Sequence, residues 1–438
     1  MTLLIVFFAL LALILLVTWG KCNAFLAFLV VSIATGLCLG IPADRITRSV
    51  QKGIGDTLGS LVVIIMLGAM LGKLVAASGA AKRITDVLMK AFGEKNIQWA
   101  LMVTGFIVGI PLFYNVGFVL MVPLIFSVVY QYKLPAVYIG LPMLASLSVT
   151  HGFLPPHPSP SALVTQFNAN MGLTLLYGFV IAIPTIIVAG PVFARTLKNI
   201  NSIPLKTFQP PVLKENEMPG PANSFLSSLL PVLLLATTAL LPLLPAMQNS
   251  FWPALLAFMG DPITVMLLSV IVATFTLGIA NGKSMKEVMD IYGDAVKDVS
   301  MIVLIVAGAG VLKQVLVDSG VSDAIAAQLQ NWSIPPLVLG WLIAAVLRVC
   351  IGSATVAGLT TAGIVAPTIT QLNVEPNLMV LSIGAGSLMF SHVNDAGFWL
   401  YKEYFNLSIK DTLRSWSLME TIVAIMGLLG VLLLNLVV

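Results

Sequence analysis

The stretch THGFLPPHPSPSA, Thr150–Ala162, decides the fold class because it places four prolines inside a long apolar segment: Pro155, Pro156, Pro158 and Pro160. The surrounding residues 134–194 contain no Asp, Glu, Lys or Arg, and a helix needs only about 20 apolar residues to span a bilayer. Proline lacks a backbone N–H and disrupts the interior of a helix. We therefore predict a membrane helix that is broken here, with backbone N–H and C=O groups freed inside the membrane.

A second stretch, SHVNDAGFW at Ser391–Trp399, corresponds to the first in a later part of the chain. Just before the two breaks, ASLSVTH at Ala145–His151 matches GSLMFSH at Gly386–His392. Further upstream, GAMLGKLVAASG at Gly68–Gly79 matches GAGVLKQVLVDSG at Gly308–Gly320. VPLI at Val122 also matches APTI at Ala366. The matches keep the same order at offsets of 240 to 244 residues, so the pattern indicates an internal duplication with two broken helices.

Each half also contains an apolar stretch that is interrupted in its middle. The first, residues 98–132, contains GIPLFYNVG with a central proline and asparagine, and the second, residues 335–371, contains IGSATVAG with Ser353 and Thr355. Basic residues flank the first stretch on both sides, and none flank the second. By the positive-inside rule, both ends of each stretch lie on one side of the membrane. We predict two re-entrant helical hairpins; the alternative is two ordinary spans joined by a tight turn.

The whole composition agrees with a membrane protein. Hydrophobic residues make up 58% of the 438 residues and charged residues 9%, with a net charge of +4. Soluble proteins carry about 25% charged residues, and nucleic-acid-binding proteins concentrate basic ones. The three cysteines have no spacing typical of a metal site or disulfide framework. We predict an all-α polytopic membrane protein without cofactor, metal site or nucleic-acid partner.

Five prolines in residues 195–224 forbid a continuous helix, so this segment is predicted to be a linker between the halves. Its basic residues place it in the cytoplasm, and four later loops agree, whereas Arg45, Arg48 and Lys52 fall on the external side. This path inserts the two copies in opposite orientations, as in secondary transporters. The predicted divisions are scaffold spans at 1–54, a first inverted repeat at 55–194, the linker, scaffold spans at 225–292 and a second inverted repeat at 293–438.

The sequences GIPLFYNVGFVLMVPL, THGFLPPHPSP, GSATVAG and SHVNDAGFW resemble the gluconate permease family of bacterial sugar-acid:proton symporters, over nearly the whole chain. The resemblance implies the fold of the ion-transporter superfamily, in which a scaffold domain dimerises and a transport domain of hairpins and broken helices moves as an elevator. It also implies a multi-pass protein of the bacterial inner membrane. Gluconate is the commonest substrate in that family, and other members carry related sugar acids, glycerate or D-serine.

Arg348 and Asp395 are the two charged residues that lie well inside the long apolar stretches. A guanidinium can bind a carboxylate through two hydrogen bonds, which suits an anionic substrate. The Asp395 carboxyl could bind and release the coupling proton, or it could brace the broken helix. A contact between Arg348 and Asp395 would join these roles, because protonation of Asp395 would free Arg348 for the substrate.

The three histidines lie in or next to the breaks. His151 and His392 occupy matching repeat positions, and His157 lies between two prolines. Histidine changes charge close to neutral pH, so His151 and His392 are candidates for proton coupling and all three for substrate binding. The alternative is that each imidazole only binds freed backbone groups.

A polyhydroxylated substrate also needs neutral donors and acceptors at the hairpin tips and breaks. The candidates are Tyr114, Asn115, Thr150, Ser159, Ser353, Thr355 and Asn394. Single Ser and Thr residues in membrane helices often bond their own backbone, so each is weak evidence alone. Lys73 and Lys313 lie near predicted span ends, where we expect their ammonium groups to reach toward water.

The sequence thus predicts a secondary transporter that imports gluconate or a related sugar acid with protons, working in the lipid bilayer as a homodimer. One alternative is a sodium-coupled carrier of another small organic anion or hydroxy acid. A membrane enzyme that uses His151, His157 and Asp395, and a channel, are further alternatives. An ATP-driven pump is not favoured, because the chain has no GxxxxGKT phosphate-binding loop.

Overall fold

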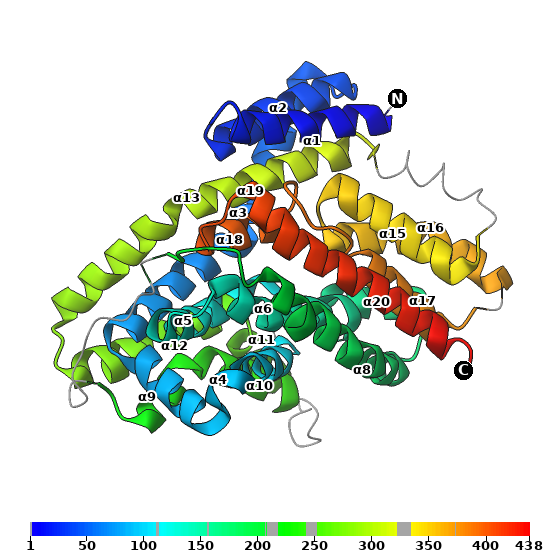
Figure 1. Cartoon of the computed structure of the whole chain (residues 1–438). Helices are drawn as coiled ribbons and strands as arrows, with labels where there is room; N and C mark the ends of the chain where they lie inside the picture. The colour runs from blue at the N-terminus through cyan, green and yellow to red at the C-terminus, as the bar shows by residue number, and fades with distance from the viewer. Residues whose placement is uncertain are drawn as a thin grey trace.

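The computed structural model describes residues 2–110, 114–155, 157–205, 207, 218–241, 252–321, 334–372 and 374–438. All regular structure in these ranges is helical, as Figure 1 shows. Pro111 at the expected tip of the first hairpin, Pro156 in the first break and residues 208–217 of the linker lie outside the described residues.

The first half of the chain runs from α1 to α8, and the second half from α9 to α20. The first-half helices are α1 (Thr2–Thr18), α2 (Ala24–Cys38), α3 (Ala43–Ala77), α4 (Ala80–Gly109), α5 (Tyr114–Tyr132), α6 (Ala136–Phe153), α7 (Pro158–Gln166) and α8 (Met171–Ile187). The second-half α-helices are α9 (Pro221–Ser228), α10 (Leu230–Leu240), α11 (Trp252–Met259), α12 (Pro262–Ala273), α13 (Met285–Asp318), α15 (Pro336–Ile351), α16 (Ala354–Leu372), α17 (Pro376–Gly386), α18 (Ala396–Tyr404), α19 (Ile409–Thr412) and α20 (Leu418–Leu434).

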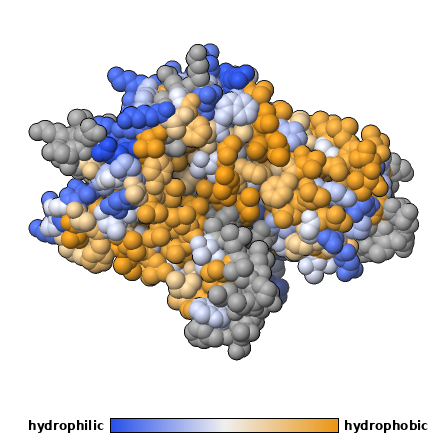
Figure 2. Space-filling view, turned by 90° about the horizontal axis from the view of Figure 1, so that it is seen from below, coloured by the Kyte–Doolittle hydropathy of each residue, from blue (hydrophilic) through white to orange (hydrophobic). Residues whose placement is uncertain are grey.

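Seven helical segments in the described part of the chain are long and apolar enough to cross a membrane. They are Ala43–Ala77, Tyr114–Tyr132, Ala136–Phe153, Met171–Leu197, Pro262–Asn281, Met285–Asp318 and Ile409–Leu434. Five shorter apolar helices accompany them, including α2 and α15. Figure 2 shows a face where hydrophobic residues cover much of the centre and hydrophilic residues gather toward the edges. These features are those of a multi-pass membrane protein.

The two longest helices, α3 and α13, pack against each other and run antiparallel. Gly53 of α3 lies against Gly310 of α13, and further along Lys73 Nζ lies 2.9 Å from Asp298 Oδ2. Thr207, from the linker region, donates a hydrogen bond of 2.6 Å to the same carboxylate oxygen. The ammonium of Lys73 therefore joins the two central helices at a partly exposed ion pair.

Gly310→Ala is expected to lower the melting temperature and reduce transport. A Cβ at Gly310 would lie 2.7 Å from the Gly53 carbonyl oxygen, and backbone cannot rotate away as a side chain can. Overpacking of this kind destabilises by about 1–3 kcal/mol. Gly293→Ala is the matched control on the same helix, because a Cβ there meets nothing within 4 Å and Ala favours a helix over Gly. Thermal unfolding of the two variants in detergent checks this, and equal melting temperatures would contradict it.

Both interrupted stretches form pairs of helices, and in the second stretch the turn between the two helices is described. In the second, α15 ends at Ile351, Gly352 adopts a left-handed conformation with φ +80°, and α16 begins at Ala354. In the first, α4 bends at Gly93, and its last turns precede α5. We call these pairs the first hairpin (residues 94–132) and the second hairpin (residues 336–372).

The two proline- and asparagine-containing stretches lie between separate helices. α6 ends at Phe153 and α7 starts at Pro158, where a missing N–H is harmless because the first turn of a helix has no partner for it. α17 ends at Gly386 and α18 starts at Ala396. A further interruption separates α9, which ends at Ser228, from α10, which starts at Leu230, because Pro231 near the start of α10 cannot continue the preceding helix.

Candidate functional site

A cavity of about 420 Å³ lies between the central helices and the hairpins. On one side it is lined by α3 and α13, through residues such as Asp56 and Lys313. On the other side it is lined by the start of α5, the turn of the second hairpin and the break before α18. Its volume falls within the range of about 300–1,000 Å³ that is usual for small-molecule sites.

Arg348 and Asp395 form a buried ion pair in this cavity. The Nη2 atom of Arg348 lies 2.5 Å from Oδ2 of Asp395, and the two side chains are 5% and 16% exposed. Nε and Nη1 of Arg348 are also buried, and within the described residues they have no hydrogen-bond partner. Because the guanidinium has five N–H groups, Arg348 keeps unused donors that can bind a second carboxylate.

Two further contacts position the Asp395 carboxylate. It is the N-cap of α18 and accepts a hydrogen bond of 3.1 Å from the Gly397 backbone N–H. Ser391 donates its hydroxyl to Oδ2 of Asp395, and the Ser391 oxygen accepts from Trp416 Nε1 at 2.8 Å. The contact with Arg348 that the sequence suggested is therefore present, and the carboxylate also braces the start of α18.

Three helix N-termini open into the cavity. They are the starts of α5 (Tyr114 and Asn115), of α16 (Ala354, Thr355 and Val356) and of α18 (Ala396 and Gly397). The N-terminus of a helix carries unpaired N–H groups and a positive partial charge, so it attracts anions. Three of them around one cavity, together with Arg348, create a site suited to a negatively charged molecule.

Several buried polar atoms in the cavity wall lack hydrogen-bond partners within the described ranges. Besides the two nitrogens of Arg348, they are Tyr114 OH, His151 Nδ1, Asn394 Oδ1 and Glu420 Oε2. Buried polar groups in proteins are nearly always paired, and unpaired ones call for an explanation. A small molecule rich in hydroxyl groups would supply both donors and acceptors to this set.

Comparison with known proteins places these features in a family. The model of the GntP family permeases matches residues 1–437. The chain belongs to this family. The high-affinity gluconate transporter of Escherichia coli strain K12 is 49% identical over 439 residues, with 100% of both chains covered. The Gnt-II system L-idonate transporter of that strain is 47% identical over 97% of each chain. The gluconate permease of Bacillus subtilis strain 168 is 44% identical with 100% of both chains covered.

Membership of a permease family excludes the membrane-enzyme alternative for this GntP family chain. His157, one of the proposed acid–base residues, has its Nε2 atom 2.9 Å from the Gly109 carbonyl oxygen at the end of α4. That nitrogen is therefore occupied by the backbone and does not act on a substrate. His151 and His157 have their rings 5.3 Å apart in an edge-to-face arrangement. No cluster of three or more His, Cys, Asp or Glu with metal-binding geometry occurs in the part of the permease that the structure describes.

The structure brings eight of the residues selected from the sequence to the cavity of this permease. They are Tyr114, Asn115, His151, Arg348, Ser353, Thr355, Asn394 and Asp395. Ser353 also accepts a hydrogen bond of 3.4 Å from the Val356 N–H, which caps the start of α16.

Four selected residues do not line the cavity. Thr150 donates to the Leu147 carbonyl at 3.0 Å within its own helix, and Ser159 is buried on α7. His157 and His392 bind carbonyl oxygens near the ends of the inbound hairpin helices, at Gly109 and at Val349, with distances of 2.9 and 2.8 Å. Each histidine therefore links a break to a hairpin, and His151 is the histidine that lines the cavity.

Replacing the two neighbouring histidines should have different effects. His157→Leu leaves the Gly109 carbonyl without this donor, and an unsatisfied buried acceptor costs about 1–3 kcal/mol. We expect a lower melting temperature with an unchanged KM. His151→Leu should instead raise KM with little change in melting temperature, because His151 lines the cavity and its Nδ1 has no hydrogen-bond partner within the described residues. Uptake kinetics and thermal unfolding of both variants check this, and the same pattern in both would contradict it.

Sequence analysis missed seven residues that line the cavity: Asp56, Thr57, Ser60, Ser148, Lys313, Trp416 and Glu420. Lys313 was expected to reach toward water at a span end, and the structure places it on α13 in the wall of the cavity. The repeat offered a signal, because Lys313 matches Lys73 and Asp56 lies 242 residues before Asp298, the partner of Lys73. Glu420 was overlooked because it directly precedes the charge-free final segment, although it lies inside a long apolar helical segment.

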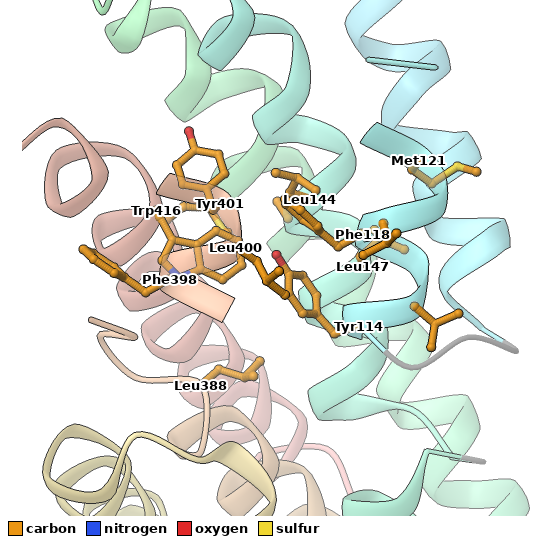
Figure 3. Close-up of a cluster of buried hydrophobic side chains, with 14 of the residues drawn as sticks. Tyr114, Phe118, Met121, Leu144, Leu147, Leu388, Phe398, Leu400, Tyr401 and Trp416 are labelled. Atoms are coloured by element: carbon orange, nitrogen blue, oxygen red, sulfur yellow. The ribbon is translucent and has the colours of Figure 1, made fainter. Parts of the chain in front are cut away.

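Aromatic side chains form a rigid wall beside the cavity. Tyr114 packs against Trp416 with ring centroids 5.4 Å apart, and Trp416 packs against Tyr401 at 5.5 Å. Figure 3 shows the ring of Tyr114 directed from its helix toward this group, with Phe118 on the same helix. The start of α5 in the first hairpin is thereby packed against α18 and the π-helical turn Leu413–Ser417 of the permease.

Proposed function

We propose that this permease imports gluconate or a related sugar acid in symport with protons across the bacterial cytoplasmic membrane. The observation that carries the proposal is Arg348, whose buried Nε and Nη1 have no partner in the described structure, in a cavity lined by three helix N-termini. A carboxylate satisfies those donors. The hydroxyl groups of a sugar acid suit the neutral groups around it, such as Tyr114, Asn115 and Asn394.

The names of the relatives support this substrate class. Two of them are named as gluconate carriers and one as an L-idonate transporter, and all three are aligned over nearly the whole chain. Gluconate and idonate are both six-carbon acids with several hydroxyl groups. We propose that Arg348 binds the shared carboxylate and that the neutral groups of the cavity select the hydroxyl pattern.

We propose an elevator mechanism in which two parts of the chain move past each other. The cavity lies between α3 and α13 on one side and the hairpins and the second break on the other, which suits a site carried by a moving part. The proposed division places scaffold spans in residues 1–54 and 225–292 and inverted repeats in 55–194 and 293–438. Because α3 and α13 each continue across a boundary, we assign both whole helices to the scaffold. A homodimer through the scaffold remains part of the proposal.

Protons suit this cavity better than sodium as the coupling ion. Sodium would need freed carbonyl oxygens, but the Val349 carbonyl accepts hydrogen bonds from His392 and Asn394 at 2.8 Å each. Asn394 also donates to the Cys350 carbonyl at 3.2 Å. The titratable groups that line the cavity, among them Asp395 and His151, are the candidate proton sites, whereas His392 lies outside it.

Purified permease in liposomes tests the proposal. An interior made more alkaline than the bath should drive accumulation of radiolabelled gluconate above its outside concentration, and an imposed sodium gradient should not. Uptake that only equilibrates would refute symport, and accumulation driven by sodium alone would transfer the coupling to that ion. Competition by idonate, glycerate, D-serine and the neutral polyol glucitol then ranks the substrates, and we expect the six-carbon acids to compete best.

A further inference from the structure

Glu420 is a deeply buried carboxyl group in the wall of the proposed substrate cavity. It lies on α20 and is 1% exposed. Its Oε1 accepts a hydrogen bond of 2.6 Å from the Ser148 hydroxyl of α6. Its Oε2 is buried and, among the residues described, has no hydrogen-bond partner. An ionised carboxylate with one buried, unpaired oxygen is strongly disfavoured, whereas the neutral acid leaves no charge unpaired.

Asp395 has the opposite environment in the same cavity. Its carboxylate receives the Arg348 guanidinium, the Ser391 hydroxyl and the Gly397 N–H. Asp395 thus already has three partners, whereas Oε2 of Glu420 has none among the described residues. The geometry therefore leaves Glu420 as the carboxyl of the cavity with an oxygen open to a proton.

The other titratable and charged groups around Glu420 come from several elements. His151 lies on α6, Tyr114 on α5 and Arg348 on α15, and all three line the cavity. Asp395 precedes α18, and Asp56 and Lys313 lie across the cavity on α3 and α13. Of the other elements packed against α20, α17 and the π-helical turn Val188–Val192 have no titratable side chain, α8 has only Tyr177, and the π-helical turn Leu413–Ser417 has only Arg414. Asp56 already pairs with Lys52 at 2.9 Å.

Building on the proposed symport, we propose that Glu420 is the proton-binding group that couples proton entry to sugar-acid entry. A proton from the external water adds to the Glu420 carboxylate and leaves to the cytoplasm after the substrate has left. Protonation adds one positive charge to the cavity and a monocarboxylate adds one negative charge, so binding both leaves its charge unchanged. Binding the anion beside an ionised Glu420 would instead bring like charges together in a poorly solvated cavity. One proton therefore accompanies each substrate anion, and transport is electroneutral.

The test compares wild type, Glu420→Gln and Asp395→Asn in liposomes. With one proton per anion, a gradient of one pH unit supports about tenfold accumulation, because the inside-to-outside ratio of substrate then equals the outside-to-inside ratio of protons. We expect wild type to approach this value and Glu420→Gln to reach only the outside concentration. Exchange of external labelled gluconate for internal unlabelled gluconate should persist in Glu420→Gln, because the glutamine amide preserves shape and neutrality. Glu403→Gln, on α18 outside the cavity, is the matched control and should accumulate like wild type.

Each outcome has a defined meaning. The assignment would be overturned if Glu420→Gln accumulated gluconate like wild type while Asp395→Asn did not. Asp395 would then be the proton-binding group. A membrane potential that drives accumulation without a pH gradient would overturn the electroneutral balance. Failure of wild type itself to accumulate would refute proton symport, which is a separate result. If Glu420→Gln is inactive even in exchange, infrared difference spectra of wild type decide. Addition of gluconate must then change a carboxylic-acid band, and an unchanged band would overturn the assignment.

Discussion

Arg348→Ala is expected to weaken gluconate binding by at least about 25-fold. The Arg348 guanidinium is deeply buried in the cavity wall, where it would pair with the gluconate carboxylate. Removing one partner of a buried, hydrogen-bonded charge pair costs about 2–5 kcal/mol. Each 1.4 kcal/mol corresponds to a tenfold change in affinity. Binding of a neutral polyol should change far less, because it has no carboxylate for Arg348 to hold. Equilibrium binding of labelled gluconate in detergent, with glucitol as competitor, measures both.

The single variant also leaves Asp395 buried without its cation, which could unfold the protein by itself. The double variant Arg348→Met, Asp395→Asn removes both charges and keeps two side chains of similar volume. It should recover the melting temperature while gluconate binding stays weak. Recovery of binding together with stability would show that Arg348 acts through folding and not through the substrate.

Gly352→Ala is expected to lower the initial uptake rate more than tenfold. Gly352 turns the second hairpin with φ +80°, a left-handed conformation that costs other residues about 1–2 kcal/mol. A Cβ there would overlap the backbone of Asn394, whose carbonyl carbon lies 2.6 Å from the Cβ position. The second hairpin would have to separate from the break before α18, and this would pull apart Arg348 and Asp395.

Gly363→Ala, on α16 of the same hairpin, is the matched control. Among the described residues, its Cβ would meet the Gln166 amide nitrogen alone, at an ordinary distance of 3.7 Å. Initial uptake rates of the two variants at equal amounts of folded protein check the prediction. Wild-type uptake by Gly352→Ala would mean that the turn tolerates a side chain and that the two elements need not stay in contact.

The candidate site was only partly predictable, and particular residues show why. Arg348 and Asp395 stand out because charge is scarce in apolar segments, so composition alone indicates them. The three histidines share a residue type and a similar setting, and the sequence could not rank them. Their roles depend on neighbours: the Gly109 and Val349 carbonyls bind His157 and His392, 48 and 43 residues away along the chain, and His151 is left facing the cavity.

The multi-pass helical class could be predicted from the amino-acid sequence, because it follows from local hydrophobicity. The two interrupted stretches and the breaks at the prolines and at Asn394–Asp395 could also be located, because proline lacks a backbone N–H and polar residues interrupt apolar segments. Tertiary structure decided which groups share one cavity. Glu420 and Ser148 are 272 residues apart in the chain, and Lys313 joins Arg348 only through the packing of α13 beside the hairpins. A buried polar group becomes informative only when its surroundings leave it unpaired, and that depends on atoms from distant helices.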